Sequence, residues 1–115
     1  MARAKHGIVE IVANDEKYTL KPTLEAYDRI EKNFGSLVEL FQKIMQRGPV
    51  LTINEVTYIV AAGCDINSNK EMKKLKENIY AEGVLAVSPQ VAEFISKMLD
   101  PSGKAEQKED ADEGE

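Results

Sequence analysis

The sequence of 115 residues contains one histidine, one cysteine and no tryptophan. A single cysteine, Cys64, cannot form a disulfide within the chain, and no cysteine–histidine grouping has the spacing of a metal site. The one histidine, His6, lies in a short charged N-terminal stretch that no fold would hold in place as a catalytic base. Glycine-rich phosphate loops are also missing. We therefore expect a protein that is not an enzyme and uses no cofactor or metal.

Long apolar runs are missing as well. No run approaches the roughly 20 residues that cross a bilayer, and the N-terminus lacks the apolar segment of a secretory signal. These absences predict a cytoplasmic protein without a membrane partner.

Charge is distributed unevenly along the chain. The net charge is −5, and residues 101–115 contribute six acidic side chains and two lysines, a net of −4. Because this segment has no apolar residue except alanine, we expect a disordered acidic tail. The sequence predicts a flexible N-terminus over residues 1–6, a single domain over residues 7–100, and the tail.

The stretch from Tyr18 to Gly35 changes periodicity halfway. Tyr18 and Leu20 alternate with polar residues, as in a half-buried strand, and Pro22 must end that strand. Thr23 is a suitable N-cap for a helix that Gly35 closes. The apolar stripe of this helix consists of Tyr27, Ile30 and Phe34. A strand therefore leads directly into a helix, and the two share a core.

A second strand precedes this stretch. Residues 8–13 are rich in β-branched side chains, and Asn14–Asp15 is a turn that tolerates positive φ. Together with residues 17–21 they predict an antiparallel hairpin. An isolated two-stranded hairpin is marginal, so it needs helices across one face or a neighbouring subunit at its edge.

Four further helices follow, each predicted from an apolar stripe and its end signals. The first of them starts at a Ser36–Glu39 capping box and ends at Gly48–Pro49, and the second starts at a Thr52–Glu55 capping box and ends near Gly63. The third runs from about Asn69 to Gly83, and the last starts at Ser88–Pro89. The predicted fold is α+β, with an N-terminal antiparallel β-hairpin packed on four to five short α-helices.

Two motifs resemble known functional sites, but each lacks residues that the function requires. Residues 65–69 resemble half of an EF-hand loop, but Lys70 and Lys76 occupy the positions that need glycine and glutamate. Residues 48–69 could contain the second helix of a helix-turn-helix, yet they hold no lysine or arginine to contact phosphates. We expect neither calcium nor nucleic acid binding.

Protein binding remains. The fourth helix has only a thin apolar stripe, and residues 84–87 form a run of four apolar residues. That run is either a buried connection between helices or an exposed patch for a subunit or client. The candidate partner surface is Val84, Leu85 and Val87. Cys64 fits a small buried apolar residue better than a reactive thiol.

A family resemblance emerges from the hairpin and the first helix. The residues that carry it are Gly7, Tyr18, Leu20, Pro22, Glu25, Ala26, Ile30, Glu31, Gly35 and Leu37. Over residues 7–63, and less closely to Leu99, the chain resembles the tail tube protein gp10-like family of tailed phages and gene transfer agents. Members of that family look like tail assembly chaperones. The motif is mainly a folding signature.

The resemblance implies a non-enzymatic role in tail morphogenesis within the host-cell cytoplasm. A chaperone of this type would bind the tape measure protein and the tail tube protein, and a homo-oligomer is compatible with the open hairpin. Two alternatives stay open: a structural tube or minor tail component retained in the virion, and a small protein-binding adaptor unrelated to phage.

Overall fold

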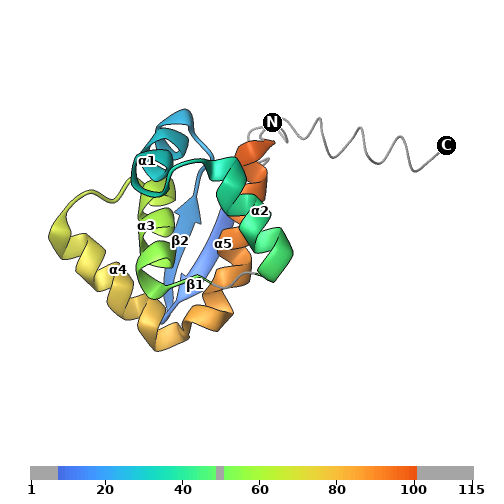
Figure 1. Ribbon diagram of the computed structural model, residues 1–115. Helices are drawn as coiled ribbons and strands as arrows, with labels where there is room; N and C mark the ends of the chain where they lie inside the picture. The colour runs from blue at the N-terminus through green and yellow to red at the C-terminus, as the bar shows by residue number, and fades with distance from the viewer. Residues whose placement is uncertain (1–7, 49–50, 101–115) are drawn as a thin grey trace.

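The computed structural model describes residues 8–48 and 51–100 (Figure 1). These residues form a hairpin followed by five helices. The elements are β1 (Val9–Ala13), β2 (Glu16–Leu20), α1 (Leu24–Phe34), α2 (Leu37–Arg47), α3 (Ile53–Cys64), α4 (Asn69–Glu82) and α5 (Val84–Leu99). The predicted α+β class is confirmed. The predicted N-terminal and C-terminal tails and the motif residue Gly7 lie outside the described residues.

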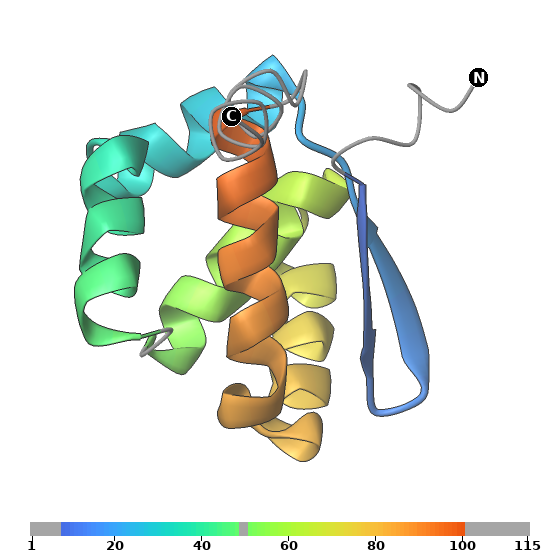
Figure 2. The ribbon, with the colours of Figure 1, turned by 90° about the vertical axis from the view of Figure 1, so that its right-hand side faces the viewer.

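The hairpin turns tightly because Asn14 and Asp15 both adopt positive φ, 53° and 68°. Such angles suit a two-residue hairpin turn, and asparagine and aspartate tolerate them. The strands pair antiparallel from Val9 opposite Leu20 to Ala13 opposite Glu16. Side chains of β1 alternate between buried and exposed, as in a half-buried strand. The helices therefore cover one face of the hairpin, and Figure 2 shows this arrangement from the side.

The tip of the hairpin is fastened to α4. The Asn14 backbone N–H donates to a Glu82 carboxylate oxygen at 2.9 Å, and its side-chain amide donates to Asn78 Oδ1 at 3.2 Å. Asn78 in turn donates from Nδ2 to the Tyr18 hydroxyl at 2.7 Å. These bonds supply the support that a two-stranded sheet needs.

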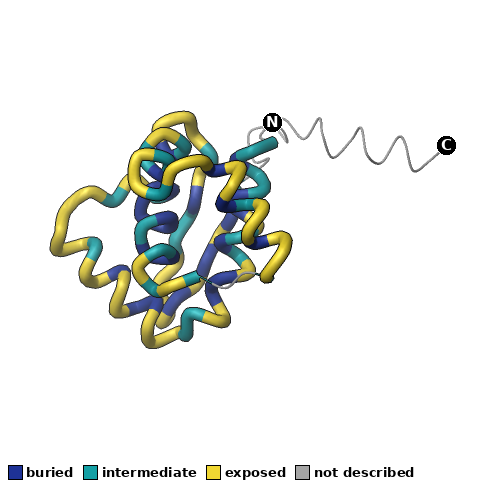
Figure 3. The backbone as a smooth tube through the Cα atoms, in the orientation of Figure 1, coloured by how far each residue is buried: buried dark blue, intermediate teal, exposed yellow. Residues whose placement is uncertain are grey.

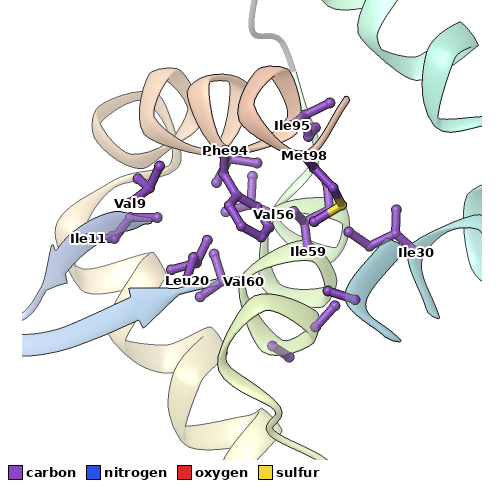
Figure 4. Close-up of a cluster of buried hydrophobic side chains, with 14 of the residues drawn as sticks. Val9, Ile11, Leu20, Ile30, Val56, Ile59, Val60, Phe94, Ile95 and Met98 are labelled. Atoms are coloured by element: carbon purple, nitrogen blue, oxygen red, sulfur yellow. The ribbon is translucent and has the colours of Figure 1, made fainter. Parts of the chain in front are cut away.

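Helix α3 forms the centre of the core. It packs against α1, α4, α5 and β2, and most residues from Val56 to Gly63 are buried. In Figure 4, Val56, Ile59 and Val60 of α3 lie among side chains from both strands and from α5, with the Phe94 ring between them. A helix buried on most sides needs apolar residues on most faces, which is why α3 lacks the narrow stripe of a surface helix.

Helices α1 to α3 start at the predicted caps, and α4 starts after Ser68. Backbone N–H groups of the first turns donate to the side chains of Thr23, Ser36, Thr52 and Ser68. Thr52 and Glu55 form a complete capping box. Each such cap is worth about 1 kcal/mol. Local sequence therefore sets the starts of α1 to α4.

The start of α5 differs from the prediction. The helix begins at Val84, so Ser88 and Pro89 lie inside it and do not cap it. Pro89 has no N–H to donate back along the helix, and the hydroxyl of buried Ser88 has no hydrogen-bond partner. The burial of Val87 and Val91 in the core holds the chain helical here in spite of these losses.

Helix α3 ends near Gly63, as predicted: its last residue is Cys64, and Asp65 caps it in the left-handed conformation. The apolar pattern of the second helix also predicts Met45 as part of its buried stripe, and this was wrong, because 69% of the Met45 surface is exposed. Only the packing of α2 on α1 and α5 decides which flank of its broad apolar face is covered.

Candidate protein-docking groove

The family-motif residues build the hairpin and the α1–α2 corner. Leu20, Ala26, Ile30 and Leu37 are buried in the core. The Glu31 carboxylate accepts a hydrogen bond from the Leu37 N–H at 2.9 Å and so joins the end of α1 to the start of α2. Gly35, between these helices, has a φ of 82° that other residues rarely adopt. These contacts give the motif a structural role.

The predicted partner surface at the start of α5 is reduced to one residue. Val87 is 1% exposed and belongs to the core, and Val84 packs half-buried against it. Leu85 is 83% exposed. Because these residues occupy one helical turn, they point to different sides of α5 and do not form a common patch.

A cleft of about 690 Å³ lies between the end of β2, the start of α1 and the end of α3. Lys21, Glu25 and Arg29 line it. The Arg29 guanidinium is already engaged, because it donates to the Ile66 carbonyl at 2.6 Å and to Asn67 Oδ1 at 3.1 Å. Arg29 therefore fastens the loop after α3 and is not a free anion-binding group.

Cys64 lies in the wall of this cleft. Its thiol is 3.3 Å from the Thr19 carbonyl oxygen, and burial raises the pKa of the thiol to about 11. A thiol with this pKa is protonated at neutral pH, whereas nucleophilic attack requires the thiolate.

A second hollow is mostly apolar and runs between α3 and α4. It consists of two adjoining cavities of about 450 and 460 Å³, both of which Lys73 and Lys76 line. The other lining residues are Asn33 of α1, Ile53, Asn54, Thr57 and Tyr58 of α3, and Met72, Glu77 and Tyr80 of α4. We call these residues the α3–α4 groove. In Figure 3 the outer side of α4 is largely exposed.

The groove is bounded by regular helix faces. Met72, Lys76 and Tyr80 follow one another at four-residue spacing on α4, so they line one side of that helix. Eight residues of helix span about 12 Å. Tyr80 at one end is 77% exposed, an unusual position for a large aromatic residue on a small domain.

The α3 wall is held rigidly. The Tyr58 hydroxyl donates to the Arg29 carbonyl oxygen at 3.1 Å, and its ring meets Phe34 edge to face with centroids 5.4 Å apart. The Arg29 guanidinium lies 5.4 Å from the centre of the same ring. Contacts on three sides fix the Tyr58 side chain, so this wall exists before any ligand binds.

The charge of the groove is one-sided. Lys70, Lys73, Lys74 and Lys76 are exposed on α4. None of these four lysines lies within ion-pair distance of a carboxylate in residues 8–48 and 51–100. The α3 wall carries no lysine or arginine.

Thr57 of the lining carries a hydroxyl that is closed off from the groove. The residue is 4% exposed, and its hydroxyl oxygen is buried without a hydrogen-bond partner. Such groups are uncommon in folded proteins and cost about 1–3 kcal/mol each.

Sequence reasoning found the thin stripe of the fourth helix but missed Thr57, Tyr58 and Tyr80. The available signal was Tyr80 itself, which falls beside the stripe of Leu75 and Ile79 and has no place in it. The groove depends on the spacing of α3 and α4, which no local pattern encodes.

Within the part of the chain that the structure describes, no three acidic, cysteine or histidine side chains are grouped as a metal site would require. The described helices include none that is long and apolar enough to span a bilayer. Comparison with family models, curated proteins and solved structures gave no match. The family resemblance therefore stays a prediction.

Proposed function

We propose that this protein is a non-enzymatic binding module for tail morphogenesis, of the tail assembly chaperone type. The observation that carries the proposal is the α3–α4 groove, an apolar surface on a small domain with no element of the described chain over it. The resemblance to the gp10-like family supplies the partners, the tape measure and tail tube proteins.

The groove suits a holding role. Large apolar side chains contribute about 1.5–3 kcal/mol each when they leave water, so two or three anchors supply about 3–9 kcal/mol, and after an association cost of at least about 4 kcal/mol the groove alone gives weak binding. A client held at this strength can be released as a tail grows. Such a surface needs neither a cofactor nor a catalytic group.

The test is co-expression of the full chain with tape measure fragments. We expect the two to co-purify, and the complex to be lost in Tyr80→Ser. Leu24→Ser is the matched control, because Leu24 is 75% exposed, close to the 77% of Tyr80, and lies on α1 away from the groove. Equal capture by both variants would place the client elsewhere.

The protein composition of mature particles distinguishes a chaperone from a structural tail component. A chaperone leaves before the tail is finished, so mass spectrometry of mature particles should find little of this protein. Stoichiometric copies in finished tails would reject the chaperone reading in favour of a tube component.

A further inference from the structure

The groove restricts the backbone conformation of its ligand. Its walls are helix faces, whose N–H and C=O groups already bond within α3 and α4. An extended segment laid on this apolar floor would bury its own backbone groups without partners, which is costly. A helix satisfies its backbone internally and can pack its side chains between two helices. The lining therefore selects a helical ligand.

The charge restricts its composition. The lysines of the groove lining, Lys73 and Lys76, both belong to α4, and the α3 wall offers the uncharged residues Ile53, Asn54 and Tyr58. A ligand helix in the groove therefore has one flank beside ammonium groups and the other beside neutral side chains. Glu77 on α4 is the single acidic residue of the lining, and it is outnumbered by Lys73 and Lys76.

From the helical walls and the lysines of the lining we infer that the α3–α4 groove binds an amphipathic helix with an apolar stripe and with acidic residues along the flank that faces α4. This inference rests on the proposed function, because it names the chemical class of client for the same groove. It goes beyond the proposed function because it predicts that the groove distinguishes between helices of equal hydrophobicity by the charge of their flanks.

The probe is a synthetic amphipathic helix of about 18 residues with a leucine stripe, long enough to cover the groove. One version carries glutamates on one flank, and a second carries lysines at the same positions. We expect the full-length protein to bind the glutamate version at least tenfold more tightly at low salt, with the difference shrinking at high salt. Equal affinities would overturn the inference.

Charge reversal locates the effect. Lys73→Glu with Lys76→Glu should abolish or invert the preference for the glutamate peptide. Lys32→Glu with Lys43→Glu is the control, because it makes the same change in net charge at exposed positions of α1 and α2. If both double variants lose the preference equally, the attraction is that of the whole molecule and the groove assignment fails.

Two other occupants produce different results. If the acidic segment 101–115 fills the groove, removing it should tighten peptide binding at least tenfold. If a second copy fills it, sedimentation should show a dimer that Tyr80→Ser dissociates. Either result would overturn the inference. Loss of client capture in Tyr80→Ser together with no flank preference would reject the inference and leave the proposed function standing.

Discussion

Gly63→Ala tests how closely the hairpin and α3 approach each other. A Cβ atom at this position would lie 2.9 Å from Leu20 Cγ, 2.9 Å from Phe94 Cζ and 3.0 Å from Leu20 Cβ. Ordinary carbon–carbon contacts are about 3.5–4.0 Å. Both neighbours are fully buried, and the hydrogen bond from the Lys21 N–H to the Gly63 carbonyl, 3.0 Å long, holds the two backbones together.

Two effects of opposite sign decide the outcome. Replacing glycine by alanine inside a helix contributes about 1 kcal/mol of stability. Overpacking a closed core costs about 1–3 kcal/mol, and three short contacts with two rigid neighbours favour the upper end of that range. We expect a net loss of about 1–2 kcal/mol in the free energy of unfolding, and a fall in Tm of about 5–10 °C.

Thermal and urea unfolding followed by circular dichroism measures both quantities. The same substitution in a Phe94→Leu background is the control, because the shorter side chain removes the Cζ contact and should reduce the penalty. A Gly63→Ala protein more stable than the wild type would refute the close approach of β2, α3 and α5.

Three further predictions concern the core, the tail and the thiol. Ile30→Asp places a carboxylate at a fully buried position of α1 and should leave little folded protein, while Lys32→Asp on the exposed side should remain folded; a cooperative unfolding transition in Ile30→Asp would show that this stripe is not core. Deleting residues 101–115 should change Tm by less than about 2 °C, since the segment has no side chains able to extend a core, and a larger loss would mean that it docks on the domain. Cys64 should react slowly with iodoacetamide at pH 8, and rapid labelling of the native protein at that pH would contradict the raised pKa. The contribution of the thiol to the free energy of unfolding should be complete below pH 9, where folded and unfolded thiols are both protonated, and should be lost as the pH approaches about 11.

Much of the fold could be predicted because its signals are local. The Asn14–Asp15 turn, the cap residues Thr23, Ser36 and Thr52, and the alternation along β1 each act through atoms a few residues apart. The prediction failed at Pro89, where the local rules favour a helix start. At Pro89 the burial of neighbouring valines outweighs a lost hydrogen bond.

The functional site was less predictable than the fold. The apolar run 84–87 was predicted as a partner surface because its residues are contiguous in sequence, yet the helix places some of them in the core and others on the surface. The groove residues lie on separate elements at helical spacing, and their common feature is a hollow formed when α4 packs beside α3.

Sequence alone therefore determined the order of elements, the faces of the hairpin and the caps, because backbone hydrogen bonding and side-chain periodicity act over one or two turns. Tertiary structure alone decided that Gly63 is a contact point, that Met45 is outside the core, and that Thr57 and Tyr80 share one groove. These outcomes depend on which surfaces of the five helices and the hairpin pack against each other. That packing minimises the free energy of the whole domain, so it cannot be read from any single segment.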